Sequence, residues 1–573
     1  MCGIAGFVGK NNKISKKDRE FFVNKMLYLI KHRGGDAYNV KSFENITMGH
    51  TRLSIVDRSP LSNQPYSTVD NSFMLSFNGE IYNFKELAKK YFNPLAIVSK
   101  SDTVILFELL RNFSIKSVLT KIEGMFAFSF FNNNRKVINL VLDRFAIKPL
   151  YYVDTPEFFA WASEIKAFKA LPNFKFETNE SVLGEFMVFR YVAGNSTLFK
   201  NVYRLQAGEH LTYDTIRNSI LNTKKYYQLK KTNRTVSFSE KLISSTVKKH
   251  LIGDAEAGVQ LSGGVDSSLV TFFTQKFSKK PIHTFSIGLK DKKWNEFYFS
   301  NKVAKKLGTQ HHKITFSKKD FVRYLREVAY YLDEPLVHPN TIPMFILAKE
   351  ARKYTKVLLT GEGADEVFLG YDRYLYKKSS QDDLIFANAF NHEETVSRIF
   401  KKSISVINRK KILDGAKKLK LNDKLSFNDI YTYLPHVLLR QDKAGMAANV
   451  ENRVPFLDRY VVEEGFNSTN KIGKFGGKNQ IKKIALKYFS KDIVLRKKCG
   501  FGLPISDWLR DKDGLLSHLL RLKESQLIKN FFNIKEINII IDDHLRQKKD
   551  NSSILFTLIS LTIWHDIFIT NNS

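Results

Sequence analysis

The heptapeptide Ser262-Gly263-Gly264-Val265-Asp266-Ser267-Ser268 decides the architecture of the second half of the chain. It stands between an apolar segment, residues 257–261, which predicts a strand, and residues 267–277, which predict a helix. Glycines allow a tight turn and close approach of the backbone, and consecutive N–H groups at a helix start form a cradle for anionic oxygens. Asp266 adds a carboxylate that can hold Mg²⁺ beside phosphates.

This loop lacks the Gly-Lys-Ser/Thr ending of a Walker A motif. It resembles instead the loop of enzymes that cleave ATP to AMP and pyrophosphate. The competing interpretation is a glycine-rich turn that caps a helix. Five fixed residues match by chance in roughly one chain of this length in a thousand, so we expect a binding loop for ATP.

A second acidic loop, Thr360-Gly361-Glu362-Gly363-Ala364-Asp365-Glu366, follows a further predicted strand at residues 356–360. Ligands of a parallel sheet bind at the carboxyl ends of its strands, so both loops are expected to face one crevice. Asp365 would be a second ligand of Mg²⁺, and Glu362 a general base. Alone, such a loop is more often a solvated turn, and its pairing with the first loop reverses that preference.

After the glycine-rich loop, a predicted strand at residues 283–287 is followed by a predicted helix at residues 296–307, and this alternation of strands and helices predicts a parallel sheet. Beyond residue 371 the chain is mostly helical. Residues 429–439 form one predicted helix, in which Pro435 is expected to add a kink, and residues 555–568 form another.

The first 200 residues are rich in short apolar or alternating runs separated by Asn, Asp, Gly and Pro. Two predicted helices, residues 17–30 and 103–112, interrupt them, so we expect two packed sheets with a few helices. Residues 213–238 are polar and predict a boundary, which divides the chain into units 1–212 and 235–573. The predicted strands are 4–8, 73–77, 125–130, 137–142, 150–152 and 158–162.

The net charge of +34 and the pI near 9.7 raise the question of nucleic-acid binding. The lysines are spread along the whole chain and no nucleic-acid-binding motif is present, so no such partner is expected. No membrane association is expected either, because the most apolar run, residues 554–564, is far shorter than the roughly 20 residues of a spanning helix. Two cysteines, Cys2 and Cys499, predict a reducing, cytoplasmic setting.

Cys2 follows the initiator Met1, which is usually removed before a small residue. The mature chain would then begin with a cysteine whose α-amine, ordinarily titrating at about 7.7–8.0, can act as base toward its own thiol. Taken alone, a cysteine at this position is more simply a small buried apolar residue.

Four other positions favour chemistry at Cys2. Arg52 offers a fork for an α-carboxylate. Asn78 and Gly79 offer an amide and a backbone N–H for an oxyanion, with the carboxylate of Glu80 beside them. Asp102 adds a second carboxylate, although its position at a predicted helix start fits an N-cap equally well. Together these groups predict a site that binds glutamine and releases ammonia from its side chain.

At this point the motifs resemble those of the glutamine-hydrolysing asparagine synthetase family over nearly the whole chain. Departures from the family pattern are Gly35 in place of proline, Ala146 in place of glycine and Asn295 in place of a common aspartate. The matching motifs are residues 1–6, 32–36, 52–57, 77–83, 124–128, 143–145, 147–152, 162–166, 261–268, 284–288, 332–335, 361–366 and 453–458.

The resemblance implies an N-terminal αββα sandwich of the N-terminal-nucleophile class, followed by an α/β adenine-nucleotide α-hydrolase-like domain with a helical C-terminal part. It implies Cys2 as nucleophile, Asn78 and Gly79 as the oxyanion hole, and Arg52, Glu80 and Asp102 as glutamine ligands. It further implies that Lys498 steadies the adenylation transition state, although a lysine in a basic run is often only a surface charge. The residues implied to bind ATP are Leu261, Ser262, Gly263, Gly264, Asp266, Ser267, Ser268, Ile287, Thr360 and Gly361.

The implied reaction converts aspartate, glutamine, ATP and water into asparagine, glutamate, AMP and diphosphate, with Mg²⁺ on Asp266 and Asp365. It proceeds through a β-aspartyl-adenylate, and ammonia travels through a channel closed to water. One alternative is a relative that amidates the carboxylate of a sugar acid for a surface polysaccharide. The other is an inactive basic scaffold protein, which the presence of Cys2, Arg52, Asp266 and Asp365 disfavours. A homodimer is one possible assembly.

Overall fold

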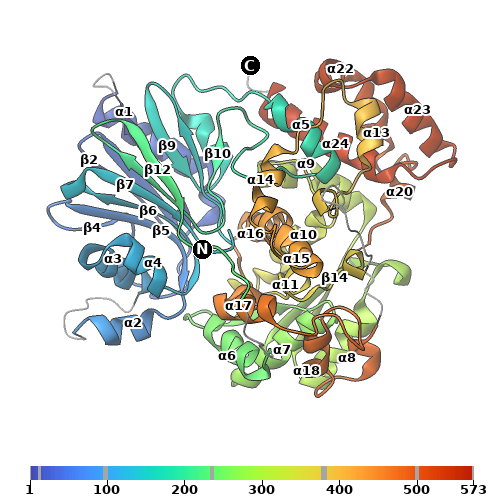
Figure 1. The fold of residues 1–573 in the computed structure, drawn as a ribbon, viewed down its shortest axis with the longest axis horizontal. Coiled ribbons are helices and arrows are strands. Elements are labelled where there is room, and N and C mark those ends of the chain that lie inside the picture. Colours follow the sequence, from blue (N-terminus) through green and yellow to red (C-terminus); the bar gives the residue numbers. More distant parts are fainter. Residues whose placement is uncertain are drawn as a thin grey trace.

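The computed structural model describes residues 2–10, 14–93, 101–232, 238–375, 384–496 and 502–570. Within these residues the first part of the chain forms two six-stranded antiparallel sheets, and the second part forms one five-stranded parallel sheet surrounded by helices (Figure 1). The predicted fold class, a double-sheet sandwich followed by an α/β unit with a helical C-terminal part, is confirmed.

The first sheet places the N-terminal strand at its centre, between β9 and β3. Side chains alternate across β1: Ile4 and Val8 lie between the two sheets, while Ala5 and Phe7 lie on the opposite face, in the core that also contains residues of helix α1 (Lys16–Leu29). The residue before β1, Cys2, is thereby held at the end of a central strand. In sheet order the strands are β10 (Tyr203–Arg204), β8 (Tyr151–Asp154), β9 (Phe158–Ala162), β1 (Gly3–Gly9), β3 (Ile46–Arg52) and β2 (Ala37–Phe43).

The second sheet packs one face on the first sheet and the other on helices α2 (Phe84–Tyr91), α3 (Asp102–Asn112) and α4 (Ile115–Lys121). Two sheets between two helical layers give the expected αββα order. In sheet order the strands are β12 (Ser219–Lys225), β11 (Glu209–Asp214), β7 (Val137–Leu142), β6 (Gly124–Asn132), β5 (Phe73–Ile81) and β4 (Tyr66–Ser67).

The hairpin of β11 and β12 lies where a polar boundary was expected. β12 is an edge strand with mostly exposed side chains, so it lacks the apolar residues that mark a buried strand. The second sheet therefore continues to Lys225, beyond the predicted end of the first unit at residue 212, and the division of the chain into two units stays a prediction.

The third sheet is parallel and lies between two helical layers, with α6 (Glu240–His250), α7 (Val265–Phe277) and α8 (Phe297–Leu307) on one face and α10 (Thr341–Ala351) and α16 (Leu434–Ala447) on the other (Figure 1). In sheet order its strands are β15 (Gln310–Phe316), β14 (His283–Leu289), β13 (Ala257–Gln260), β16 (Val357–Leu359) and β17 (Glu451–Arg453). The inner strands β14, β13 and β16 are mostly buried, as expected for a sheet covered on both faces, whereas the edge strands β15 and β17 consist mostly of polar residues.

The helix predicted at residues 429–439 is part of a longer helical run. Helix α15 (Leu421–Asn428) continues into a π-helical turn (Asp429–Tyr433) and then into α16. Pro435 lies in the first turn of α16, where its missing N–H costs little, so the irregularity is the π turn before the proline.

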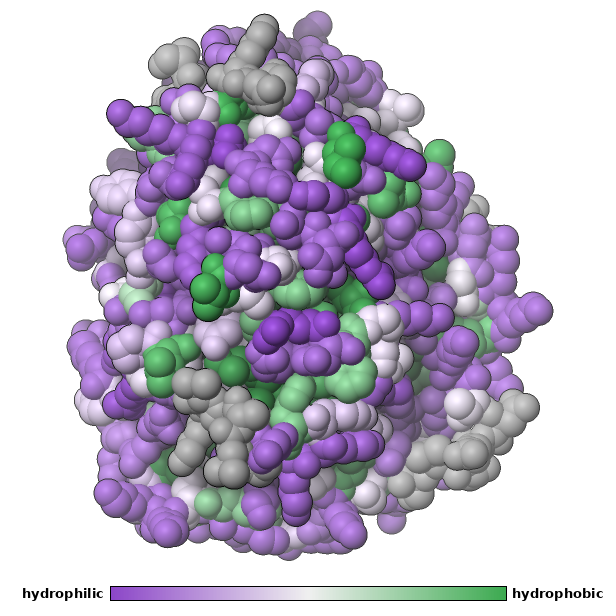
Figure 2. Space-filling model, turned by 90° about the vertical axis from the view of Figure 1, so that its left-hand side faces the viewer, coloured by the Kyte–Doolittle hydropathy of each residue, from purple (hydrophilic) through white to green (hydrophobic). Residues whose placement is uncertain are grey.

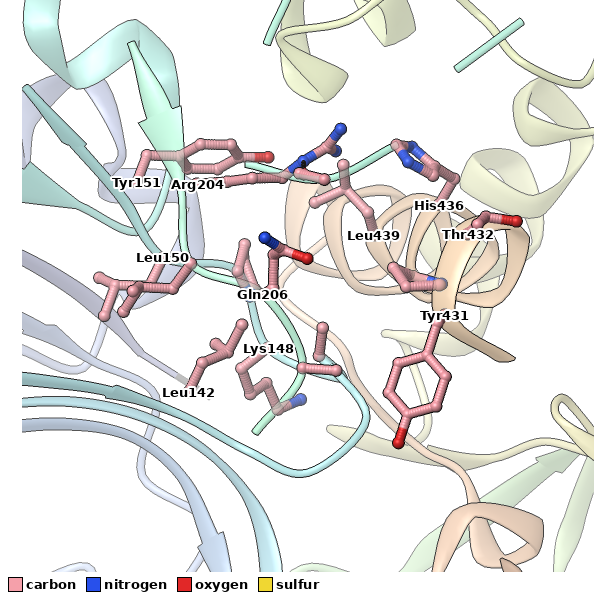
Figure 3. A pocket seen from close by; sticks show the side chains of 16 residues that line it. Leu142, Lys148, Leu150, Tyr151, Arg204, Gln206, Tyr431, Thr432, His436 and Leu439 are labelled. Carbon is pink, nitrogen blue, oxygen red and sulfur yellow. Dashed lines mark hydrogen bonds between the residues drawn. The ribbon is translucent and has the colours of Figure 1, made fainter. Parts of the chain in front are cut away.

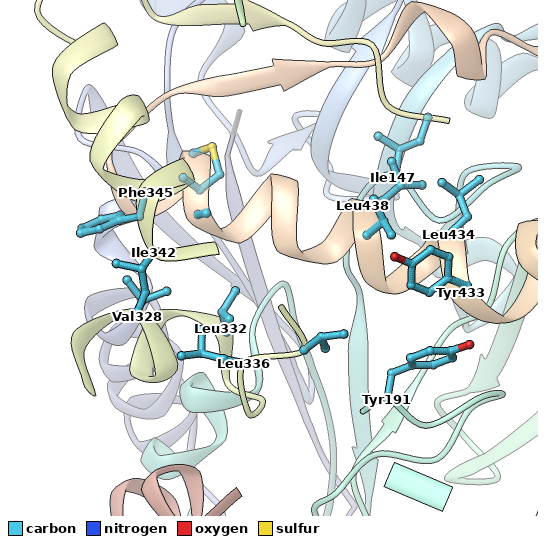
Figure 4. Close-up of a cluster of buried hydrophobic side chains, with 14 of the residues drawn as sticks. Ile147, Tyr191, Val328, Leu332, Leu336, Ile342, Phe345, Tyr433, Leu434 and Leu438 are labelled. Atoms are coloured by element: carbon cyan, nitrogen blue, oxygen red, sulfur yellow. The ribbon is translucent and has the colours of Figure 1, made fainter. Parts of the chain in front are cut away.

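One hydrophobic core spans both parts of the chain. Tyr191 and Ile147 of the first part lie with Tyr433 and Leu438 of the helical run in this core (Figure 4). The last helix, α24 (Ser552–Phe568), is buried along nearly its whole length. No described helix is both long enough and apolar enough to cross a membrane. The shared core holds the two parts of the chain against each other.

The departure from the family pattern at Ala146 has a local structural consequence. Its φ angle is +57°, in the left-handed region that glycine occupies without steric cost. An L-residue pays roughly 1–2 kcal/mol there. Ala146 is packed against the core, and neighbouring contacts hold the turn in place.

Candidate active sites

Cys2 lies at the junction of the two antiparallel sheets. Its backbone nitrogen donates to Oδ1 of Asn78 on β5, at 3.0 Å, and its side chain is nearly buried. Burial raises the pKa of the Cys2 thiol, and this is opposed in part by a backbone hydrogen bond from Leu53 and by the charge of Arg52. A thiol in this setting needs a base before it can act as a nucleophile.

Asn78 and Gly79 supply donors beside Cys2. Nδ2 of Asn78 is buried and has no hydrogen-bond partner among the described residues. A buried amide donor left unsatisfied costs about 1–3 kcal/mol, which is regained when a ligand accepts its proton. Gly79 has φ +156°, and a Cβ there would lie 2.1 Å from the carbonyl oxygen of Met125. Only glycine fits at position 79, so the backbone of β5 can lie close to the neighbouring strand directly after Asn78.

Arg52 is buried near Cys2, with its guanidinium held by a loop. Nη1 donates to the carbonyl of Ser59 at 2.9 Å and to Oδ1 of Asn63 at 2.8 Å, and Nη2 donates to the carbonyl of Asp57. These partners are uncharged oxygens. A carboxylate that replaced one of them would make a stronger, charge-assisted bond.

Glu80 and Asp102 lie close together on the same side of this site. Oε1 of Glu80 is 3.3 Å from Nη2 of Arg453, a residue of the third sheet. Asp102 accepts from the backbone nitrogens of Ile81, at 3.0 Å, and Thr103, at 2.8 Å. The N-cap of α3 is Ser101, so Asp102 is not the cap that the sequence left open. Burial raises the pKa of Asp102 to about 6.

A buried ionic network crosses the interface behind Cys2. Arg33 donates from Nε to the carbonyl of Cys2 at 3.1 Å, and from Nη2 to Oδ2 of Asp442 on α16 at 2.8 Å. Its third contact is Oε1 of Glu164 at 2.7 Å. Lys148 reaches the other oxygen of Asp442 at 3.3 Å. Paired buried charges of this kind are costly to break, so they fix the orientation of the two parts of the chain.

Lys148 also lines a small cavity between the two parts of the chain. The cavity has a volume of about 50 Å³, and Arg204 and Gln206 face His436 and Leu439 of α16 across it (Figure 3). The space is large enough for only a few molecules of the size of water. The cavity lies at the interface between the two parts of the chain, next to Lys148 of the ionic network.

The two loops singled out in the sequence line one cleft of about 610 Å³, so the prediction that they face the same crevice is confirmed. Gly263, with φ +74°, lies against α8, where a Cβ would approach the backbone of Phe299 and Ser300 to 2.6 Å. Ser268 is fully buried in α7. The predicted residues that line the cleft are Leu261, Ser262, Gly264, Asp266, Ser267, Ile287, Thr360, Gly361, Glu362 and Asp365.

Asp266 and Asp365 converge on a lysine that sequence reasoning missed. Nζ of Lys478 is 2.5 Å from Oδ2 of Asp266 and 2.8 Å from Oδ1 of Asp365. The two carboxylates raise the pKa of Lys478 against the effect of burial. Two carboxylates directed at one cation are suited to Mg²⁺, which typically adds phosphate oxygens and water to one or two such ligands. The signal in the sequence was Lys478 after Gly476-Gly477.

Glu362 pairs with Arg440, another residue that was not predicted from the sequence to be part of the site. Nη2 of Arg440 on α16 is 3.3 Å from Oε1 of Glu362, and Nη1 donates to Oδ1 of Asn340 at 2.8 Å. All three residues line the same cleft. Lys498, the remaining predicted catalytic residue, lies outside the described residues.

The face over the first part of the chain is mostly hydrophilic, with apolar residues in separate spots (Figure 2). Lysines are found throughout the chain, in keeping with the net charge. The described acidic, histidine and cysteine residues form no cluster of three or more suited to a metal ion.

Two known family models match successive parts of the chain, one over the thiol site and one over the cleft. The model of the glutamine amidotransferase domain matches residues 1–227. The model of asparagine synthase matches residues 239–566, which is more than half of the chain. The chain therefore belongs to the asparagine synthase family, and its membership indicates a glutamine-dependent ligase.

Relatives align along almost the whole chain. Glutamine-hydrolysing asparagine synthetase 1 of Bacillus subtilis is 29% identical, over 99% of this chain and 97% of its own. Asparagine synthetase 3 of the same organism is 26% identical, over 91% and 92%. A solved glutamine phosphoribosylpyrophosphate amidotransferase from Bacillus subtilis, complexed with ADP and GMP, aligns at 13% identity and TM-score 0.31, over 56% of this chain and 91% of that one. A likeness that low supports no conclusion.

Proposed function

We propose that this chain is a glutamine-hydrolysing asparagine synthetase, which uses ATP to convert aspartate to asparagine with nitrogen from glutamine. Two observations together carry the proposal. A buried thiol lies beside the side-chain amide of Asn78, whose Nδ2 has no partner among the described residues, and a glycine-rich loop and an acidic loop line one cleft. The names of its relatives support the acceptor, because both B. subtilis proteins are called glutamine-hydrolysing asparagine synthetases.

In the proposed first half-reaction, the sulfur of Cys2 attacks the side-chain amide carbon of glutamine. Removal of Met1 would free the α-amine of Cys2, which takes the thiol proton and passes it to the departing nitrogen, so that ammonia leaves and a thioester remains. Nδ2 of Asn78 and the backbone N–H of Gly79 stabilise the oxyanion. Water then hydrolyses the thioester to glutamate. Arg52 binds the α-carboxylate by exchanging a loop oxygen for it, and Glu80 and Asp102 bind the ammonium.

In the proposed second half-reaction, the residues of the glycine-rich loop that line the cleft, from Ser262 to Ser267, hold the phosphates of ATP, while Leu261, Ile287, Thr360 and Gly361 contact the rest of the nucleotide. Asp266 and Asp365 would hold Mg²⁺, which neutralises phosphate charge when bound. The acceptor carboxylate attacks the α-phosphorus and diphosphate leaves, a step in which Lys498 is the proposed stabilising cation. Ammonia then adds to the acyl carbon, Glu362 takes a proton, and AMP leaves.

Ammonia has to remain unprotonated between the two sites, so the proposal includes a route closed to bulk water. The route would follow the interface, whose shared core and buried ion pairs exclude solvent. The cavity at Lys148 is one void along that interface.

The test is diphosphate release by the purified chain with ATP and glutamine, screened across aspartate and a series of uronic acids. Aspartate is expected to support release and to yield asparagine and glutamate in equal amounts. If aspartate supports none while a uronic acid does, the asparagine proposal is wrong and the acceptor is a sugar acid.

A further inference from the structure

Strand β17 lies between the thiol site and the cleft, and its side chains point alternately toward the thiol site and toward Gln260, which lines the cleft. It is the edge strand of the parallel sheet, and its three residues alternate in direction. Glu451 and Arg453 lie on the side of the thiol site, near Glu80. Asn452 lies on the other side, where it bonds to Gln260 and to α16. The second part of the chain therefore supplies side chains to the glutamine site.

Arg453 is fixed by partners from three segments. Nε pairs with Oε1 of Glu451 at 2.6 Å, and Nη1 donates to the carbonyls of His250, at 2.7 Å, and Ile252, at 2.5 Å. The side chain is almost completely buried. The remaining nitrogen, Nη2, is the one that lies 3.3 Å from Glu80. A guanidinium held this firmly defines where the carboxylate of Glu80 sits.

The backbone of the same strand holds the base of the cleft. The carbonyl of Arg453 accepts from the backbone nitrogen of Thr360, at 2.9 Å, two residues before Glu362. Oδ1 of Asn452 accepts from Nε2 of Gln260, at 3.1 Å, and Gln260 is the last residue of β13 before the phosphate loop. A displacement of β17 at Arg453 would therefore shift the backbone next to both loops of the cleft.

Arg453 also balances a concentration of negative charge. Glu80, Glu451 and Asp102 lie near one another in a buried region. Burial and the charge of Glu451 raise the pKa of Glu80, and the charge of Arg453 opposes that rise. Without the guanidinium, Glu80 would more readily take up a proton, and a neutral carboxyl binds an ammonium group weakly.

We propose that Arg453 is a positioning residue of the glutamine site, supplied by the second part of the chain, and that β17 links glutamine binding to the state of the ATP cleft. The inference rests on the proposed function, in which Glu80 binds the ammonium of glutamine. When the ammonium group of glutamine pairs with Glu80, it competes with Arg453 for that carboxylate and weakens the Glu80–Arg453 ion pair. The resulting shift of Arg453 moves its carbonyl, which accepts the hydrogen bond from Thr360 in the cleft. By thermodynamic reciprocity, ligands in the cleft change the affinity for glutamine by the same factor.

The test compares the full-length chain with Arg453→Met, measuring glutamate release from glutamine with and without ATP and aspartate, and diphosphate release with ammonium salts. The variant is expected to raise KM for glutamine at least tenfold and to abolish any effect of ATP and aspartate on that KM. Ammonia-dependent diphosphate release should stay within about twofold, because the backbone carbonyl that holds Thr360 is unchanged.

Two further variants keep the inference testable if Arg453→Met is unstable. Glu451→Gln loosens Nε of Arg453 with little change in volume, and a smaller rise in KM is expected. Arg459→Met is the matched control, because Arg459 is half-exposed and pairs with Glu463 on its own helix. It should leave KM unchanged.

An unchanged KM for glutamine in both Arg453→Met and Glu451→Gln would overturn the inference. So would a KM that rises in the variants while the wild-type chain shows no response of glutamine KM to ATP and aspartate. Failure of the proposed function has a different signature, since the wild-type chain would then release no glutamate from glutamine, or no diphosphate with aspartate.

Discussion

The substitution Asn78→Asp tests the oxyanion hole with almost no change in shape. Aspartate keeps an oxygen that can accept from the backbone nitrogen of Cys2, a contact of 3.0 Å. It replaces the buried Nδ2, which has no partner among the described residues, by a second oxygen. The donor intended for the oxyanion is lost, and a negative charge stands in its place.

Removing one such donor lowers kcat by about 10²–10³, or roughly 2.7–4 kcal/mol of transition-state stabilisation. We expect the added charge to place Asn78→Asp at or beyond the upper end of that range. The synthetase cleft does not contain Asn78, so ammonia-dependent diphosphate release should be unchanged.

The assay measures kcat for glutamate release from glutamine and, in parallel, diphosphate release with ammonium chloride, ATP and aspartate. Asn112→Asp is the matched control, because Asn112 is exposed at the end of α3 and bonds only to the carbonyl of Glu108 among the described residues. A loss of less than threefold in glutamate release would refute the reasoning. An equal loss of both activities would show that the variant acts on the fold.

Three further outcomes are expected. Cys2→Ala should abolish glutamate release while ammonia-dependent diphosphate release persists; loss of both would contradict a division into two sites. Lys478→Gln should lower the thermal midpoint by several degrees in Mg²⁺-free buffer, because Asp266 and Asp365 then repel each other, and added Mg²⁺ should restore the midpoint. The control is Lys483→Gln, at an exposed lysine of the helix that follows Lys478, and it should leave the midpoint unchanged. The pKa of Asp102 is about 6, and its ionised form is the one proposed to bind the ammonium group of glutamine. The KM for glutamine should therefore rise about tenfold for each pH unit below 6. In Asp102→Asn this rise of KM at low pH should be absent.

Much of the architecture was predictable because apolar periodicity and turn residues act locally. The predicted strand at 158–162 coincides with β9, and the helix at 103–112 begins one residue earlier in the structure. Strand β12 was missed because its side chains are mostly exposed, and β17 because three polar residues carry no strand signal. Both are edge strands. The partner of β17 is β16, which lies far away along the chain, whereas β12 forms a hairpin with β11 and was missed only because of its exposed side chains.

The chemical groups and the two loops could be predicted from the amino-acid sequence, since glycine, aspartate and serine in this order have few other uses between a strand and a helix. Which charged groups meet depends instead on how the folded chain packs. Lys478 reaches Asp266 across more than 200 residues of chain, and Arg453 reaches Glu80 across more than 370. Local sequence cannot predict such pairs, because they form only when separate sheets pack and exclude the water that would otherwise solvate each charge.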